Sequence, residues 1–266
     1  MKFKNLLTVI IGIATFTSNT HAAFPKNDFT SYFGGSQGCF ILRNLHTGAD
    51  EIVFGGKFCE ERVHPCSTFK VPIATMAIDR GIIKDENTPF KWDGKAKGME
   101  PWNRDHTAQS WMKDSVVWVS QEITPKLGMD SVKKYLKDFA YGNQDMSGGI
   151  TTAWLSSTLK ISPMEHADFI RRLWLGQLKV SAKATELTKK LTFVETLPSG
   201  GILHGKTGSG FNDEYRIGWY VGYLKSGKNE YVFSTNFRDS KKPLSKRYGG
   251  PETREIFKKI IGDLGI

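Results

Sequence analysis

The sequence lacks the ligand spacings with which proteins usually bind zinc. Its 266 residues include only three cysteines and six histidines. None of them forms a Cys-x-x-Cys, His-x-His or His-x-x-x-His pair, whereas zinc sites are typically built from such closely spaced ligands. We therefore expect no metal site in this chain.

Long apolar runs are missing from most of the chain. No segment after residue 22 is long and apolar enough to cross a bilayer. The first residues differ, because Lys2 and Lys4 precede a short apolar stretch that ends before Thr20-His21-Ala22. This is the pattern of a cleaved secretory signal, with an uncleaved anchor as the alternative. We expect residues 1–22 to be removed and residues 23–266 to be secreted into the periplasm, free of the membrane.

Cysteine is scarce and odd in number, so at least one thiol stays free. Export permits a disulfide between Cys39 and Cys59, but the sequence does not give their distance in space. Cys66 stands directly before Ser67. It could act as a nucleophile, but such a cysteine is more often a small buried apolar side chain, and this is the role that we expect.

Acidic residues are outnumbered by basic ones. The chain has 27 Asp and Glu against 37 Lys and Arg, a formal net charge of +10. Such an excess can serve nucleic acid, an anionic surface or an anionic substrate. The basic residues are spread along the chain and match no nucleic-acid-binding module, so we expect no nucleic-acid partner. A small substrate that carries a carboxylate fits better. The sequence does not indicate the oligomeric state.

Strand-like segments lie near both ends of the chain, and helix-like segments lie between them. The simplest fold is α+β, with a central antiparallel sheet built from residues 23–67 and 196–266 and flanked by terminal helices. An all-helical subdomain is inserted at residues 68–195, and both parts belong to a single domain. The expected strands are 38–43, 51–54, 202–206, 216–224 and 231–237, and the expected helices are 67–80, 107–113, 116–127, 130–139, 163–176 and 253–264.

Three local signals are more specific than the general pattern. Ser162-Pro163-Met164-Glu165 places a capping serine, a proline and a glutamate where a helix begins. Ser226-Gly227 predicts a hairpin turn. Residues 86–105 are polar and rich in glycine, tryptophan and proline, which predicts a long loop over a site.

A hydroxyl and an amine lie one helical turn apart in Ser67-Thr68-Phe69-Lys70. A serine is a poor nucleophile unless a base lies within hydrogen-bond reach, and residues i and i+3 of a helix face the same way. We therefore expect Lys70 beside the Ser67 hydroxyl. The apolar residues that follow predict a buried helix. The same spacing recurs at residues 110–113, 131–134 and 157–160, where we expect solvated helix faces.

Five short motifs follow one another along the chain: Ser67-Thr68-Phe69-Lys70, Ser115-Val116-Val117, Tyr141-Gly142-Asn143, Trp154-Leu155 and Lys206-Thr207-Gly208. In this order and at these approximate spacings they resemble the class D serine β-lactamases, the oxacillinase group, over nearly the whole mature chain. Class A enzymes carry Ser-Asp-Asn at the second motif. The resemblance implies the penicillin-binding protein and serine β-lactamase-like fold. It also implies an enzyme that hydrolyses the β-lactam amide of penicillins and related antibiotics and so gives resistance.

The resemblance assigns roles to individual residues. Ser67 attacks the lactam carbonyl and forms an acyl-enzyme, and the backbone amides of Ser67 and Ser209 stabilise the oxyanion. Ser115 and Lys206 relay protons. The substrate carboxylate is bound by Lys206, Thr207, Ser209 and Arg254, although Arg254 could also be an ordinary exposed arginine. Gly208 leaves room for the substrate along the strand edge.

In the same family the lysine at the position of Lys70 reacts with CO2 to form a carbamate, which serves as the general base. The resemblance implies no other cofactor. Phe69 and Val117 have no polar side-chain atoms that would solvate a protonated lysine, and Trp154 can donate its indole N–H to the carbamate.

Two further motifs have supporting roles. Met99 and Trp102, from the long loop, are expected to cover the site, with ordinary loop packing as the alternative. Tyr141-Gly142-Asn143 is expected to shape a turn rather than to react.

Three other interpretations share some of these motifs. A penicillin-binding peptidase also carries Ser-x-x-Lys and Lys-Thr-Gly, but the short chain, the cleavable signal and Trp154 favour a β-lactamase. The β-lactam sensor domain of a receptor has the same fold but normally accompanies several membrane helices, which this sequence lacks. A basic envelope-binding protein with chance motifs is the third. Turnover of a chromogenic cephalosporin separates the enzyme from all three, since only the enzyme deacylates quickly.

Overall fold

The computed structural model describes residues 28–211, 214–240 and 248–266. The expected signal peptide, residues 1–22, lies outside these ranges and stays a prediction. Within them, no helix has both the length and the apolar character needed to cross a membrane.

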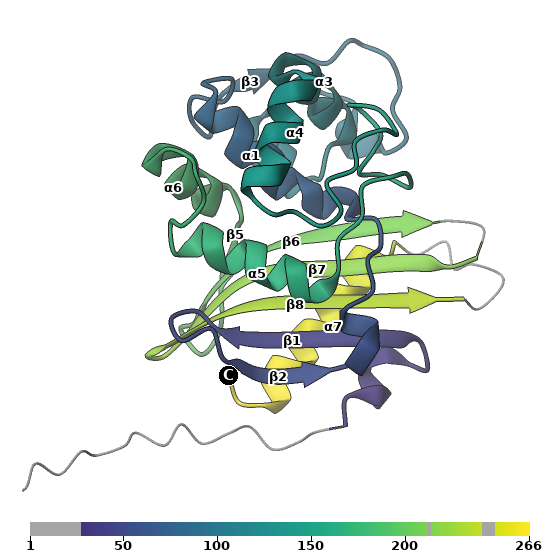
Figure 1. The fold of residues 1–266 in the computed structure, drawn as a ribbon, viewed down its shortest axis with the longest axis vertical. Coiled ribbons are helices and arrows are strands. Elements are labelled where there is room, and N and C mark those ends of the chain that lie inside the picture. The colour runs from purple at the N-terminus through teal and green to yellow at the C-terminus, as the bar shows by residue number, and fades with distance from the viewer. Residues whose placement is uncertain (1–27, 212–213, 241–247) are drawn as a thin grey trace, which may run out of the picture.

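The centre of the molecule is a six-stranded antiparallel sheet with the strand order β2-β1-β8-β7-β6-β5. Strands from the two ends of the chain meet where β1 pairs with β8, with Ile41 opposite Ser234. The expected sheet built from both chain ends is therefore confirmed (Figure 1). The strands are β1 (Gln37–Asn44), β2 (Asp50–Phe54), β5 (Phe193–Thr196), β6 (Ile202–Phe211), β7 (Arg216–Ser226) and β8 (Asn229–Asp239).

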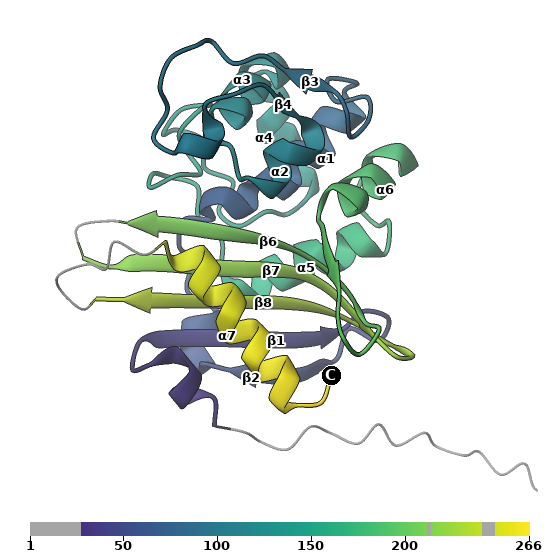
Figure 2. The ribbon, with the colours of Figure 1, turned by 180° about the vertical axis from the view of Figure 1, so that it is seen from behind.

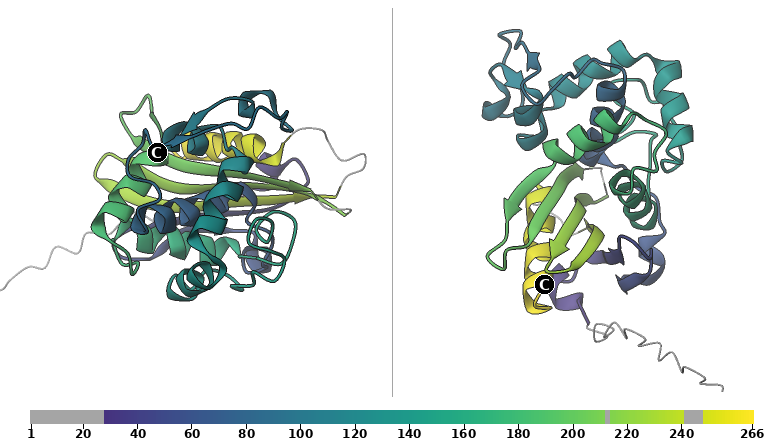
Figure 3. Two further views of the ribbon diagram at one scale, coloured as in Figure 1. Left: turned by 90° about the horizontal axis from the view of Figure 1, so that it is seen from above. Right: turned by 90° about the vertical axis from the view of Figure 1, so that its left-hand side faces the viewer.

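Helices cover both faces of the sheet. Helix α7 (Gly249–Asp263) crosses one face, as Figure 2 shows. It buries Phe257 and Ile260 against strand residues such as Tyr220 and Phe233, and Phe33 of the short 3-10 helix η1 (Thr30–Phe33) joins this core. Helix α5 (Pro163–Trp174) lies on the opposite face, so the sheet is enclosed between the two (Figure 3).

The helical part lies beyond the β6 side of the sheet (Figure 1). Its centre is α1, whose residues from Lys70 to Ile78 are all buried. A two-stranded ribbon of β3 (Pro89–Phe90) and β4 (His106–Thr107) and a 3-10 helix η4 (Glu100–Trp102) structure the expected long loop. The helices are α1 (Lys70–Asp79), α2 (Ala108–Lys113), α3 (Val117–Leu127), α4 (Met129–Asp138) and α6 (Ala182–Leu191).

Some elements differ from the sequence prediction. Neither α6 nor β5 was expected as an element of its own, and β5 is a four-residue edge strand recognisable only by its pairing with β6. Helix α7 begins at Gly249, four residues before the expected start at Thr253. The hairpin turn falls on Gly227 and Lys228, one residue later than expected, and Gly227 takes the positive φ of 57°.

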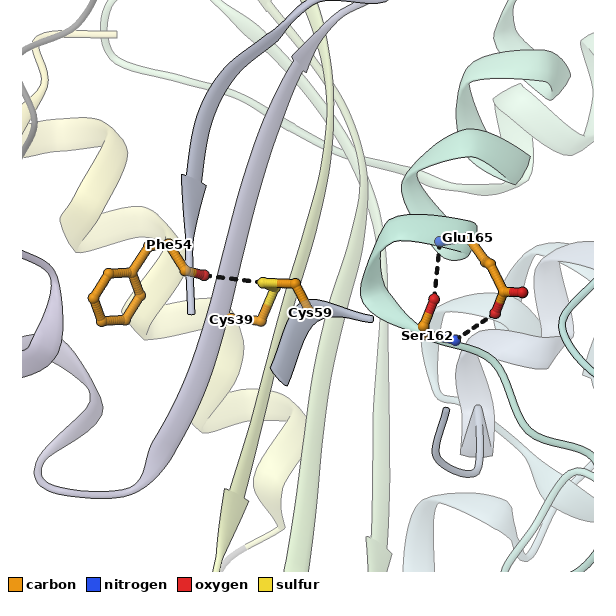
Figure 4. Close-up of a disulfide and its surroundings, with 5 residues drawn as sticks. All are labelled: Cys39, Phe54, Cys59, Ser162 and Glu165. Atoms are coloured by element: carbon orange, nitrogen blue, oxygen red, sulfur yellow. Dashed lines mark hydrogen bonds between the residues drawn. A yellow bond between two sulfur atoms is a disulfide. The ribbon is translucent and has the colours of Figure 1, made fainter. Parts of the chain in front are cut away.

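Two local predictions are resolved in Figure 4. The Ser162 hydroxyl accepts from the backbone N–H of Glu165, and the Glu165 carboxylate accepts from the N–H of Ser162, which is the expected capping box. Cys39 of β1 is disulfide-bonded to Cys59 at the end of the 3-10 helix η2 (Gly56–Cys59). Cys66 is the free thiol of the three, and it is buried as expected.

Candidate active site

Ser67 lies in a short 3-10 helix, η3 (Cys66–Phe69), which leads directly into α1. Its side chain is partly exposed, whereas Cys66 and Thr68 on either side are buried. Cys66 has a φ of 52°, a left-handed conformation that is unfavourable for a side chain with a Cβ and is found at functional sites. The backbone is thus bent sharply just before the serine, so that Ser67 faces open space.

Lys70 is fully buried at the first residue of α1, and its Nζ lies 3.4 Å from Ser67 Oγ. Burial lowers the pKa of this amine well below its usual value of 10.5, and the nearby positive charge of Lys206 lowers it further. An uncharged amine is a base and a nucleophile, which an ammonium is not. The predicted pairing of these two side chains is present.

Ser115 and Lys206 form the second polar pair. Ser115 lies between α2 and α3 with a φ of 58°, and Lys206 projects from β6. Lys206 Nζ donates to Ser115 Oγ and to Thr207 O, each at 2.9 Å. Burial lowers the pKa of Lys206 to about 7, with a further contribution from Arg254. The left-handed backbone at Cys66 and Ser115 is a shared feature that the sequence did not reveal.

Strand β6 passes close to η3 because glycines face it there. A Cβ at Gly208 would lie 2.9 Å from Pro65 O, and a Cβ at Gly210 would lie 2.6 Å from Cys66 Sγ. These glycines therefore let β6 approach the segment that contains Ser67. This packing alone explains why side chains are absent at the two positions. Cys66 is a packing thiol in this contact, and burial raises its pKa to about 12.

Within the described ranges, no strand pairs with the outer edge of β6 beside Ser67. β5 pairs only with residues 202–204 of β6, and the N–H of Gly205 donates outward to Thr192 O. Because strand residues alternate with a period of two, the N–H groups of Thr207 and Ser209 point to the same side. The Ser209 hydroxyl is already engaged, since it accepts from the N–H of Gly250 at 2.8 Å.

A cavity of about 320 Å³ opens over Ser67, and we call it the front cavity. It brings together eight of the predicted site residues. It also includes residues that the sequence did not single out for this site, notably Asp114, Leu155 and Tyr248. The predicted residues that line it are Ser67, Met99, Trp102, Ser115, Val117, Thr207, Ser209 and Arg254.

The loop residues Met99 and Trp102 line this cavity because two tryptophan hydrogen bonds hold the loop in place. Trp102 Nε1 donates to Asp114 O at 3.0 Å, and Trp118 Nε1 donates to Trp102 O at 2.9 Å. The loop is thus fixed by ordinary packing contacts and also lines the cavity over Ser67. Trp118 is a positioning residue that the sequence analysis missed, since nothing in its local pattern marks it.

Trp154 is fully buried and stacks on Phe69, the residue before Lys70, with 5.5 Å between the ring centroids. Its carbonyl accepts from the N–H of Cys66 at 2.9 Å. Its indole N–H is buried without a hydrogen-bond partner among the described residues. Such an orphaned donor is costly, so this environment is suited to an additional acceptor.

The Tyr141-Gly142-Asn143 motif forms the expected turn. Gly142 has a φ of 52°, and a Cβ there would lie 2.0 Å from Lys160 O. Asn143 Oδ1 accepts from the N–H of Lys160 at 2.8 Å. The turn therefore anchors the segment that leads from Trp154 to α5.

Arg254 projects from α7 to the rim of the front cavity. Its Nε is buried without a hydrogen-bond partner in the described part of the chain, and the Glu255 carboxylate is 3.7 Å away. Its side chain is 42% exposed and lines the cavity that contains Ser67, so its role in binding substrate stays a prediction.

An accessible serine beside a buried lysine of lowered pKa, a Ser–Lys pair and a strand edge that no described strand pairs with, all on this fold, define a penicillin-recognising serine enzyme. The family described as penicillin binding protein transpeptidase domain matches residues 18–262. The chain is 46% identical to beta-lactamase OXA-1 of Escherichia coli over 211 residues, 76% of each chain. It is 34% identical to the probable beta-lactamase YbxI of Bacillus subtilis over 88% of this chain and 90% of that one.

A solved structure agrees with these relatives. The class D β-lactamase from Bacillus subtilis superposes with a TM-score of 0.83 at 33% identity, covering 92% of this chain and 98% of the other. The chain therefore belongs to the class D serine β-lactamases, which are hydrolases. In the described ranges no cluster of His, Cys, Asp or Glu side chains could hold a metal ion.

Proposed function

We propose that the enzyme opens penicillins through an acyl-enzyme on Ser67, with Lys70 carrying a CO2-derived carbamate as the general base. The main support for this proposal is the position of Lys70, which is fully buried with its Nζ 3.4 Å from Ser67 Oγ. At this distance the lysine group reaches the proton that Ser67 must lose.

The surroundings of Lys70 fit a carbamate. Burial lowers the pKa of its amine well below the usual value and so favours the uncharged form, and an uncharged amine can bond to CO2 with loss of one proton. Trp154 offers a buried indole N–H without another partner, and a charged acceptor is the most favourable occupant for such a donor. The carbamate supplies an anionic base next to Ser67. No other cofactor is required.

The remaining residues bind substrate and stabilise charge. Ser67 Oγ bonds to the lactam carbonyl carbon and the C–N bond breaks, so the carbonyl oxygen becomes negative on the way. The N–H groups of Ser67 and Ser209 are suited to this oxygen, since Ser209 N–H points to the free edge of β6. Lys206, joined to Ser115 at 2.9 Å, can pass a proton to the leaving nitrogen.

The substrate carboxylate is expected beyond Thr207, at Arg254. Both residues line the front cavity, and a guanidinium whose Nε–H has no hydrogen-bond partner among the described residues suits a carboxylate. Lys206 adds positive charge behind them. The deacylating water then regenerates Ser67 by attack on the ester, with Lys70 again taking the proton.

Carbon-13 NMR of protein equilibrated with labelled bicarbonate tests the carbamate directly. We expect one carbamate signal in wild-type enzyme and none in Lys70→Ala, which should accumulate acyl-enzyme. Activity should fall after acid treatment and CO2 removal and should return on adding bicarbonate at fixed pH.

Trp154→Phe should weaken carbamate retention, because it removes the indole donor but keeps the ring. Trp174→Phe, on α5 against Tyr223, is the matched control and should behave as wild type. A spectrum without a carbamate signal, together with turnover that ignores bicarbonate, would show that Lys70 acts as a plain amine.

A further inference from the structure

A second cavity, of about 450 Å³, lies along β6 behind the front cavity, and we call it the rear cavity. It is bounded by α2, by the β5–β6 edge and by α7. Lys113, Thr207 and Arg254 line both cavities, so they form the wall between them. Lys206 lines only the rear one.

The rear cavity is strongly cationic. Lys113, Lys206 and Arg254 reach it from three different elements, and no carboxylate is among the described residues that line it. Three acids close to these residues in the sequence or in space have partners of their own: Asp114 pairs with Arg104 at 2.9 Å, Glu195 pairs with Lys258 at 2.6 Å, and Glu255 lies 3.7 Å from Arg254 Nε. The positive charges of Lys113 and Arg254 repel each other and the charged form of Lys206, whose pKa is about 7, and an anion between them removes that repulsion.

Tyr220 provides a second, independent feature. It is 1% exposed, it lines the rear cavity, and its hydroxyl has no hydrogen-bond partner among the described residues. The hydroxyl lies over Gly205, where a Cβ would come within 2.5 Å of it. Gly205 therefore leaves this buried donor uncovered at the cavity. Burial raises the pKa of Tyr220, so the hydroxyl keeps its proton for donation.

The remaining lining side chains are apolar except for Gln109. Met112 comes from α2, Leu191 from the end of α6, and Phe193 and Val194 from β5. A small inorganic anion would leave these apolar side chains in contact with water. An anion with a flat or branched apolar body uses both kinds of surface, because its body contacts these side chains while its carboxylate meets the cations.

We propose that the rear cavity is a second binding site, for a small organic carboxylate with an apolar body, distinct from the site over Ser67. The Tyr220 hydroxyl and Arg254 bind the carboxylate of this ligand. Because Arg254 is shared by the two cavities, an occupied rear cavity weakens its hold on a substrate carboxylate. The ligand therefore raises KM without occupying the serine site.

Benzoate is the probe, with benzamide as its uncharged counterpart. Binding is measured by ligand-detected NMR, and crystals soaked with 4-bromobenzoate locate the probe by bromine anomalous scattering. We expect benzoate to bind at least about tenfold more tightly than benzamide, since a hydrogen bond to a charged group contributes about 1.5–3 kcal/mol. The bromine should lie between α2 and β5.

Two variants test the assignment. Tyr220→Phe removes only the hydroxyl and should weaken benzoate by about tenfold, and Val194→Trp should fill the cavity and abolish binding. Tyr32→Phe, on η1 and part of the lining of neither cavity, should bind as wild type. In wild type benzoate should raise KM for benzylpenicillin, and in Tyr220→Phe it should not.

Three outcomes would overturn the proposal. These are equal affinity of Tyr220→Phe and wild type for benzoate, equal affinity of wild type for benzoate and benzamide, and bromine found only over Ser67. None of them touches the proposed acyl-enzyme mechanism, because the carbamate signal of Lys70 is measured separately.

Discussion

Lys206 Nζ donates a hydrogen bond to Ser115 Oγ at 2.9 Å, between residues 91 positions apart in the sequence. The lysine is buried, its pKa lies at about 7, and Arg254 contributes to that lowering. At neutral pH the group therefore divides between a charged form that attracts carboxylates and a neutral form that accepts a proton from Ser115. This pair joins the helical part to the sheet at the site itself.

The pH dependence of kcat/KM should report Lys206. Above about pH 7 the free enzyme loses this positive charge, so kcat/KM for benzylpenicillin should decline on the alkaline side. Lys206→Arg keeps the charge at all accessible pH values and should remove the decline, at a lower overall rate. Steady-state kinetics from pH 6 to 9 measures this. An alkaline decline that is unchanged in Lys206→Arg would assign it to another group.

Ser67→Ala should abolish covalent labelling by penicillin while leaving the melting temperature nearly unchanged, because one partly exposed hydroxyl contributes little to stability. Mass spectrometry of the intact protein detects the acyl group. Ser131→Ala is the matched control, since Ser131 and Lys134 have the same spacing on α4. Label that persists on Cys66 or Ser115 in Ser67→Ala would contradict the assignment of the nucleophile.

Arg254→Ala should raise KM for penicillins by about 10- to 100-fold with a smaller effect on kcat. A charge-assisted hydrogen bond contributes about 1.5–3 kcal/mol, and a tenfold change corresponds to about 1.4 kcal/mol. Lys258→Ala, on the same helix and paired with Glu195, controls for loss of a positive charge and should leave KM unchanged. An unaltered KM in Arg254→Ala would make Arg254 an ordinary surface residue.

The free energy of unfolding should decrease as the pH is lowered, because of His166. This side chain is fully buried, with Nε2 2.9 Å from Thr68 Oγ1, and burial lowers its pKa from 6.5 to about 3. Between these values the unfolded chain binds the proton and the native state does not. The contribution of His166 to stability is therefore present above about pH 6.5 and is lost at about 1.4 kcal/mol per pH unit below it.

Urea unfolding between pH 7 and pH 4 measures this slope. His166→Gln keeps an N–H donor near Thr68 but does not titrate, so its stability should depend less on pH than that of wild type. The control is His46→Gln, because His46 is an exposed residue beside Glu230. Equal slopes for wild type and His166→Gln would mean that other groups govern acid unfolding.

The mature protein should begin at Ala23 or Phe24, since Ala22 and Ala23 are the small residues that precede the two expected cleavage points. N-terminal sequencing of periplasmic protein from a Gram-negative host tests this prediction. Protein that starts at Met1 and remains in the membrane fraction would indicate an uncleaved anchor.

Much of the fold could be predicted because its signals are local. The capping box at Ser162 needs only residues within three positions, and α5 begins there as expected. The apolar pattern of the sequence predicts the two N-terminal strands and the long strands after Ile202. The edge strand β5 does not, because four residues become a strand only by pairing with β6.

The sequence by itself determined which chemical groups the enzyme has: a serine and a lysine one turn apart, a Lys-Thr-Gly strand, and five motifs in the order of one family. Tertiary structure decided what those groups become. It buries Lys70, which lowers the pKa of the amine well below its usual value, and it brings Lys206 within 2.9 Å of Ser115. It also turns Arg254 toward two cavities at once. The reason is physical: a pKa and a cavity depend on desolvation and on neighbours distant in sequence, and neither can be read from residue order.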